Sequence, residues 1–219
     1  NAANTTGGYN GIHAYNGGSG ALSITTTGET KGNGGGESLP NGIYAINSST
    51  GTSLTINAAE TEGGGSGIYA TNFGTGALSI TTTGETKGGS SGIEAANRGT
   101  GALSITTTGD TTGKTKDGIY AFSYSGGAVN ITTSGAVTGG RHGIYVQNIT
   151  DDGNNGKTSI TVTSTSTITT SANNRYGIYN RMLEYSFDDD KKNYPLSKSD
   201  VPNVITVAGT INTTGEGAH

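Results

Sequence analysis

The chain of 219 residues contains no cysteine and no tryptophan, with only three prolines and one methionine. Without cysteine, a disulfide scaffold and thiol chemistry are excluded. No apolar run reaches the ~18 residues that a membrane-spanning helix needs, so we expect no span in this segment. Lysine and arginine number only 12 and form no cluster, and the formal net charge is −4. This charge argues against nucleic-acid binding.

Hydrophobic residues make up 30% of the chain, which is low for a globular sandwich, whereas glycine is abundant, with 40 residues. The stretch Gly67 to Gly88, GIYATNFGTGALSITTTGETKG, returns almost letter for letter from Gly92 to Gly113. Such repetition, with a period of about 25 residues, indicates a stacked repeat architecture. The Gly-Ile step that opens each copy has its anchor glycine at Gly11, Gly42, Gly67, Gly92, Gly118, Gly143 and Gly177.

Apolar residues alternate with other residues inside each repeat, as they do along a β-strand. The residue after every anchor glycine is isoleucine, and the third residue is alanine or valine in the first six copies. A Leu-x-Ile or similar run follows, and then a weaker strand whose inward positions are Thr30, Thr61, Thr86, Thr111, Val137, Ile168 and Ile211. Nothing recurs at helical spacing, and the strict registers argue against a disordered glycine-rich chain.

We therefore predict an all-β fold, a single-stranded right-handed parallel β-helix with about seven coils of ~25 residues and three short strands each. Residues 1–219 form one β-helix domain with inserted loops near 33–39, 147–157 and 181–202. The last two insertions fall between first and second strands, so they should emerge from the same edge. The ending GEGAH resembles the lead-in to another Gly-Ile step, so we expect further coil beyond residue 219, while Asn1 is typical of a mature start.

The fifth residue after the anchor glycine is predicted to form an inward ladder, each amide bonding its equivalent above and below. This position holds asparagine in five of the first six copies and serine in the other: Asn16, Asn47, Asn72, Asn97, Ser123 and Asn148.

The outward positions of the first strand are mostly aromatic, whereas those of the second strand are serine and threonine. Stacked tyrosines either stabilise the sheet by ring packing or form a face that binds a partner. A third possibility is that Met182, Leu183, Tyr185 and Phe187 fold back over this face. The candidate receptor-binding residues of the face are Tyr44, Tyr69, Tyr120, Phe122, Tyr145, Tyr179 and Arg181.

The long insertion adds a second group of candidates. Its acidic triplet is interpreted as solvated loop charge, because consecutive side chains cannot all point inward and no EF-hand pattern is present. We therefore predict no metal site and no cofactor. The added receptor-binding candidates are Tyr185, Phe187, Asp188, Asp189, Asp190, Lys191, Lys192 and Tyr194.

Catalysis finds little support in the sequence. No Gly-x-Ser-x-Gly elbow, His-Glu-x-x-His helix or P-loop is present. Polysaccharide lyases use this fold with paired carboxylates and basic residues on one outer sheet, whereas Glu94 and Arg98 are interpreted as isolated residues. We predict that the chain is not an enzyme, with a lyase as the less favoured alternative.

The GIYAxN…GALSITTTGxTxG coils resemble, over essentially the whole chain, the passenger domains of type V secretion (autotransporter) proteins. More narrowly, the tyrosine-rich coils and the threonine-rich, cysteine-free composition resemble the pro-angiogenic autotransporter passengers of Bartonella. The resemblance implies a virulence protein that is secreted or at the bacterial cell surface, exported through the periplasm and outer membrane, with a translocator β-barrel in the full-length protein. The protease-type passengers carry an N-terminal serine-protease module that this chain lacks.

The narrower resemblance implies a host cell-surface receptor as partner, an endothelial growth-factor receptor whose engagement signals angiogenesis. Two classes of function remain open. The chain is either a receptor ligand or adhesin that uses its aromatic face and later loops, or a passive stalk whose active portion lies elsewhere in the full protein.

Overall fold

The structure, a computed structural model, describes residues 2–34, 39–151, 157–163, 165–170, 173, 175–188, 191–196 and 203–214. All regular secondary structure in these ranges is β-strand, and no helix is present among them. A helix long and apolar enough to cross a membrane is accordingly not found in the described residues.

Apart from β21, the strands follow one another in groups of three, and each pairs in parallel with its equivalents in neighbouring groups. Sheet 1 contains β2 (Ile12–Asn16), β5 (Ile43–Asn47), β8 (Ile68–Asn72), β11 (Ile93–Asn97), β14 (Ile119–Ser123), β17 (Ile144–Asp151), β20 (Ile178–Asp188) and β21 (Lys191–Leu196). Sheet 2 contains β3 (Leu22–Thr25), β6 (Leu54–Ala58), β9 (Leu78–Thr82), β12 (Leu103–Thr107), β15 (Val129–Thr133), β18 (Thr158–Val162) and β22 (Val204–Val207). Sheet 3 contains β1 (Thr5–Gly7), β4 (Glu29–Gly32), β7 (Glu60–Gly63), β10 (Thr86–Gly88), β13 (Thr111–Gly113), β16 (Val137–Gly139), β19 (Thr167–Thr170) and β23 (Thr210–Thr213).

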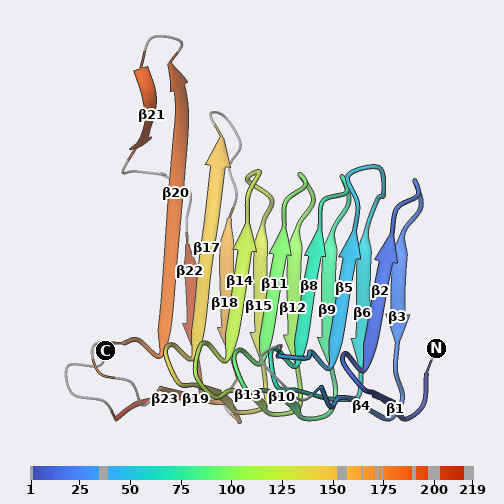
Figure 1. The fold of residues 1–219 in the computed structure, drawn as a ribbon. Helices are drawn as coiled ribbons and strands as arrows, with labels where there is room; N and C mark the ends of the chain where they lie inside the picture. Colours follow the sequence, from blue (N-terminus) through green and yellow to red (C-terminus); the bar gives the residue numbers. More distant parts are fainter. Residues whose placement is uncertain are drawn as a thin grey trace.

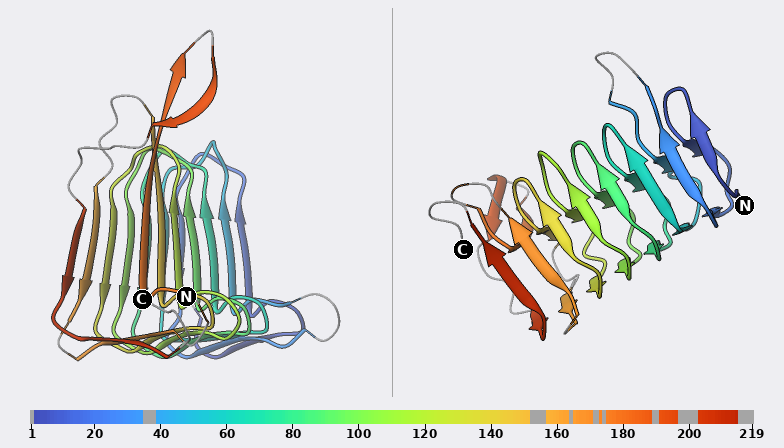
Figure 2. Two further views of the ribbon diagram at one scale, coloured as in Figure 1. Left: turned by 90° about the vertical axis from the view of Figure 1, so that its left-hand side faces the viewer. Right: turned by 90° about the horizontal axis from the view of Figure 1, so that it is seen from below.

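One strand from each sheet makes one coil, so the chain forms the predicted parallel β-helix of about seven coils (Figure 1). We number the coils from 1, which begins at β2, to 7, which begins at β20. Seen from below, the strands lie side by side in chain order from the N-terminus to the C-terminus (Figure 2).

The strand register joins residues at the same repeat position. Ile93 pairs with Ile68 in the preceding coil and with Ile119 in the following coil. In coils 2 to 6, the isoleucines, leucines, valines and alanines that point inward from sheets 1 and 2 are almost fully buried and form one continuous core, whereas most of those in the end coils are partly exposed. Each coil buries these side chains only against its neighbours, which is why the repeats must stack to fold.

The asparagine ladder is confirmed over the first four coils. The Nδ2 group of each residue donates to the Oδ1 atom of the next, from Asn16 to Asn47 (2.7 Å), from Asn47 to Asn72 (2.7 Å) and from Asn72 to Asn97 (3.0 Å). The prediction is wrong beyond Asn97. Ser123 has a shorter side chain that donates to the carbonyl of Gly127 in its own coil (3.2 Å), and Asn148 donates to the same carbonyl (3.3 Å).

The inward column of sheet 3 contains buried threonines followed by aliphatic residues. The Oγ1 atoms of Thr30, Thr61, Thr86 and Thr111 have no hydrogen-bond partner among the described residues. Val137 and Ile168 take the same position in coils 5 and 6 and are also fully buried. A buried hydroxyl without a hydrogen-bond partner lowers the stability of a fold. Each of these four threonines therefore reduces the free energy of unfolding.

Both later insertions emerge from one edge of the helix, as predicted, because they lengthen strands of sheet 1. β17 has eight residues and β20 has eleven, and they pair as far as Asp151 and Tyr185. β20 then forms an antiparallel hairpin with β21 that projects beyond the other coils (Figure 1). The hypothesis that Met182 to Phe187 fold back over the aromatic residues is therefore wrong, since β20 continues the line of sheet 1. Of the insertion near 33–39, residues 35–38 lie outside the described residues.

Replacing the unpaired hydroxyl with a methyl group is expected to stabilise the fold. We expect Thr86→Val to raise the free energy of unfolding by about 1 kcal/mol, because valine keeps the shape of threonine and no buried donor remains. The urea midpoint of Thr86→Val compared with that of the parent measures this. The control is Thr106→Val at an outward position of β12, which should change stability by less than about 0.5 kcal/mol. A lower midpoint for Thr86→Val would contradict the account of the column.

Candidate functional site

The outer face of sheet 1 carries the predicted aromatic residues. In β5, β11 and β14 the inward isoleucine, alanine and asparagine or serine are buried, so the residues between them point outward and stay partly exposed. We use the term aromatic face for the outward rings of coils 2 to 7 on sheet 1 and its following corners, namely Tyr44, Tyr69, Phe73, Tyr120, Phe122, Tyr124, Tyr145 and Tyr179.

The rings at the second residue after the anchor glycine form two stacks. In coils 2 and 3, Tyr44 and Tyr69 lie with their ring centroids 5.1 Å apart and their planes 7° apart. In coils 5 to 7, Tyr145 lies 5.2 Å from Tyr120 on one side and 5.2 Å from Tyr179 on the other. The predicted tyrosine column therefore exists, but as two separate segments.

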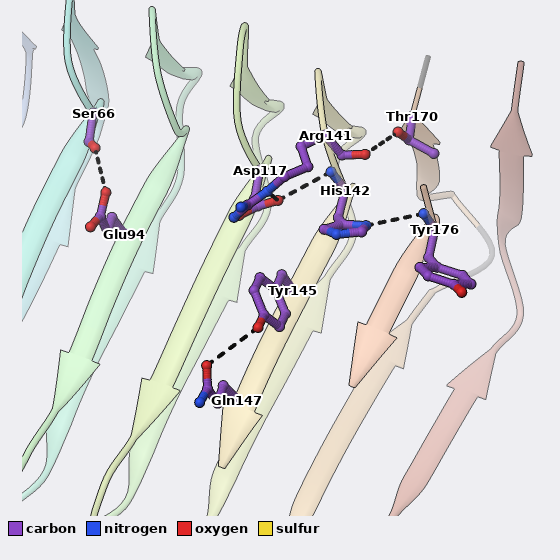
Figure 3. Close-up of polar contacts among 9 residues, drawn as sticks. All are labelled: Ser66, Glu94, Asp117, Arg141, His142, Tyr145, Gln147, Thr170 and Tyr176. Atoms are coloured by element: carbon purple, nitrogen blue, oxygen red, sulfur yellow. Dashed lines mark hydrogen bonds and ion pairs between the residues drawn. The ribbon is translucent and has the colours of Figure 1, made fainter. Parts of the chain in front are cut away.

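A notch separates the two stacks at coil 4, where the same position holds Glu94. The neighbours of Glu94 in the strand register are Tyr69 and Tyr120. A cavity of about 290 Å³ opens here, and its lining includes Tyr69, Glu94, Ala96, Arg98, Tyr120 and Phe122. The Glu94 carboxylate accepts a hydrogen bond from the hydroxyl of Ser66 at 3.4 Å (Figure 3). We call this cavity the notch.

Arg98 lies at the rim of the notch and contacts aromatic rings from two coils. Its guanidinium carbon is 5.6 Å from the centroid of Phe73 in coil 3 and 5.5 Å from that of Phe122 in coil 5. These distances are in the range of cation–π interactions. The interpretation of Glu94 and Arg98 as isolated residues is therefore wrong, because the fold brings them to one aromatic-walled cavity.

The hydroxyl of Tyr120 stays protonated beside the notch. Burial raises the pKa of Tyr120 above its ordinary value, and the Tyr145 hydroxyl and the Glu94 carboxylate raise it further. Because the phenol is neutral, Glu94 and Arg98 are the charged groups that line the notch.

A second column, at the residue before each anchor glycine, supports the aromatic face from the corner. Its side chains accept hydrogen bonds from the backbone N–H group of the equivalent residue one coil later. This holds for Asn10 and Asn41 (2.8 Å), for Asn41 and Ser66 (2.8 Å), for Asp117 and His142 (3.2 Å) and for His142 and Tyr176 (3.1 Å). We call this row of residues the corner column.

The corner column becomes charged and aromatic in coils 5 to 7. The buried carboxylate of Asp117 accepts two hydrogen bonds from the Arg141 guanidinium, one of them at 2.9 Å from Nε (Figure 3). His142 is buried against the rings of Tyr176 and Tyr179, whose centroids are 5.8 Å and 5.3 Å away. This cluster fixes the positions of the rings in the second stack.

Sequence reasoning missed this cluster, although the repeat contained a signal for it. Counting backwards as well as forwards from the anchor glycines aligns Asp117, His142 and Tyr176 with Asn10 and Asn41. All of these residues can accept or donate hydrogen bonds at a shared corner position.

The remaining candidates lie away from the notch. Arg181 is exposed on β20, opposite Gln147 of β17 in the register. Tyr185, Phe187 and Asp188 continue along β20, while Lys191, Lys192 and Tyr194 are on β21, so the hairpin carries them beyond the coils. Asp189 and Asp190 lie outside the described residues.

Within the described ranges, no three side chains of His, Cys, Asp or Glu lie close enough together to hold a metal ion. Comparison of the chain with protein-family models, with curated proteins and with solved structures found no match. The case for function therefore depends on the geometry of the aromatic face and on the resemblance of the repeats.

The buried His142 is expected to make stability depend on pH. Burial lowers the pKa of His142, with the Arg141 and Arg175 cations acting in the same direction and the Asp117 carboxylate opposing them. The unfolded chain then binds the proton more readily, so the stability is fully present above about pH 6.5 and is lost as the pH falls through the folded pKa. The protonated ring also cannot accept the Tyr176 N–H bond at Nδ1.

We expect His142→Asn to reduce this acid-induced loss, because Asn41 makes the same backbone contact in coil 2 without a titrating group. Melting temperatures of parent and variant at about pH 7.5 and about pH 5.5 measure the difference. His13→Asn, at an exposed histidine, is the matched control and should leave the change of melting temperature with pH as it is in the parent. If the melting temperatures of the parent and of His142→Asn fall equally between the two pH values, His142 is not the source of the acid-induced loss of stability.

Proposed function

We propose that this chain is an exported β-helix that acts outside the bacterial cell and binds a host cell-surface protein through its aromatic face. The observation that supports this most directly is the partly exposed set of rings on sheet 1, arranged as two stacks around a notch lined by the Glu94 carboxylate. Exposed contiguous aromatic patches mark interaction sites, and aromatic and arginine side chains dominate the energetics of protein interfaces.

The rigidity of the scaffold supports binding by this face. Backbone bonds join each strand of sheet 1 to its neighbours, and inward isoleucines lock the register. Rings that are already stacked lose little conformational freedom on binding, so most of their contact energy is kept as affinity. Over six coils spaced ~4.8 Å apart, from Tyr44 to Tyr179, the face is about 24 Å long, which suits a standard protein interface of ~800 Å² per partner.

The resemblance of the repeats to autotransporter passengers provides the biological context of the proposal. An endothelial growth-factor receptor is the partner that the narrower resemblance implies, with angiogenic signalling as the consequence. The β20–β21 hairpin, which projects beside the face, is proposed as a second contact region. The proposal includes no catalytic step.

A passive stalk is the second candidate function, and the ring geometry itself favours it. Rings 5.1 Å apart with nearly parallel planes stabilise a sheet without any partner. A variant of the aromatic face that loses binding but keeps its stability would favour receptor binding over the passive stalk.

The combined replacement of Tyr120, Phe122 and Tyr145 by serine is expected to weaken binding to endothelial cells at least ~10-fold, because three interface rings are lost. A labelled chain and a cell-surface binding isotherm measure the affinity, and circular dichroism checks that the variant is folded. The control replaces the outward Ser79, Thr81 and Thr106 of sheet 2 with alanine and should bind like the parent.

A separate variant in which a short turn replaces residues 183–200 tests the hairpin, and it is expected to bind more weakly than the parent. If the folded triple variant and the loop variant both bind and stimulate cells like the parent, the proposed function is wrong. Turnover of an acidic polysaccharide by the parent would instead identify the lyase alternative.

A further inference from the structure

The notch lies where the line of tyrosines lacks one ring. Coils 2 to 7 hold tyrosine at the second residue after the anchor glycine, except coil 4, where the residue is Glu94. Tyr69 and Tyr120 are two coils apart, or about 9.6 Å at the usual strand spacing. Since Tyr44 and Tyr69 stack at 5.1 Å over one coil, the spacing of Tyr69 and Tyr120 over two coils matches a stack with one flat group between them, beside the Glu94 side chain.

The Glu94 carboxylate forms no ion pair in the described part of the chain, although Arg98 also lines the notch. Glu94 accepts a hydrogen bond from the neutral hydroxyl of Ser66, and no lysine, arginine or histidine forms an ion pair with it there. A carboxylate between ring faces favours a cation, because the faces of both rings also attract positive charge.

The chain itself shows which cation fits such a gap. The guanidinium of Arg98 already lies between rings of coils 3 and 5, Phe73 and Phe122, at 5.6 Å and 5.5 Å. Tyr69 and Tyr120 come from the same two coils, so the gap between them has the same width along the axis. The difference is that Glu94, and not a cation, occupies coil 4 at that position.

We propose that the notch binds the guanidinium group of an arginine side chain on the protein partner, with Glu94 as the counter-ion and Tyr69 and Tyr120 as the flanking rings. That the arginine belongs to a protein rests on the proposed function. A guanidinium is flat, stacks on aromatic faces and bonds a carboxylate with two parallel N–H groups, so it matches the notch better than a lysine ammonium does. The Arg98 guanidinium is held between the two phenylalanine rings and forms no ion pair with Glu94 in the described part of the chain, so it leaves the Glu94 carboxylate without a counter-ion.

The test uses the whole chain and short blocked peptides. Acetyl-Gly-Arg-Gly-amide is titrated into the labelled chain, and the nuclear magnetic resonance shifts of the tyrosine rings are followed. We expect saturable binding on the order of millimolar, since only one side chain is engaged. The lysine peptide is expected to bind several-fold more weakly, and the glutamate peptide should give no saturable shift. Equal binding of all three peptides, or binding of the glutamate peptide alone, would overturn the proposal.

Two variants of one residue keep the test independent of folding. Glu94→Gln removes the charge and is expected to weaken binding of the arginine peptide at least tenfold. Glu94→Tyr fills the notch with the residue that the neighbouring coils carry, so it should fold like the parent and also lose the peptide. The matched control is Glu60→Gln on sheet 3, an exposed glutamate outside the notch, which should bind like the parent. Unchanged peptide binding by Glu94→Gln and Glu94→Tyr contradicts the assignment.

The cell assay separates failure of this inference from failure of the proposed function. If Glu94→Gln binds endothelial cells like the parent while the triple serine variant does not, the aromatic face binds the receptor but the arginine site is wrong. If the arginine peptide binds the parent and needs Glu94 while no variant changes cell binding, the notch binds guanidinium and the proposed function is wrong. Joint loss of peptide and cell binding in Glu94→Gln supports both.

Discussion

In-register stacking of equivalent residues is the constraint on which the whole structure depends. Parallel pairing places Ile68, Ile93 and Ile119 directly over one another, and the same pairing places Tyr69, Glu94 and Tyr120 in one line on the outside. Because side chains alternate along each strand, one shift of register would exchange the buried and exposed sets in a whole coil. The buried isoleucines therefore determine where every outward residue lies.

Columns of identical residues stabilise the fold, and single departures from them create its chemical features. Asparagine amides bond one another over four coils, but Ser123 ends the ladder because its side chain reaches only its own coil. Glu94 in the tyrosine column opens the notch in the same way, since a carboxylate cannot complete the ring stack. A repeat protein thus gains a site by changing one residue of one coil while the neighbouring coils keep the backbone fixed.

The corner column links stability to the aromatic face. Asp117, Arg141 and His142 are tied by hydrogen bonds that cross from coil to coil, and His142 packs against Tyr179 and Tyr145. Protonation of His142 would act on the same rings that are proposed to contact the partner. Core, corner and face are therefore one set of contacts, because Asp117, Arg141 and His142 help to position the rings of coils 5 to 7.

The sequence by itself determined the period, the three strands of each coil, the buried columns and the outward line of tyrosines, because these follow from local alternation repeated about every 25 residues. Only the tertiary structure decided which departures from the repeat meet in space. Glu94 and Arg98 look isolated along the chain, yet rings from the coils on either side close around them, and Asp117 reaches Arg141 and His142 one coil later. The hairpin at β20 and β21 also took its direction from pairing with β17 and not from its own sequence. The physical reason is that burial depends on a residue and its nearest neighbours in the strand, whereas a surface contact depends on rotamers and register between coils.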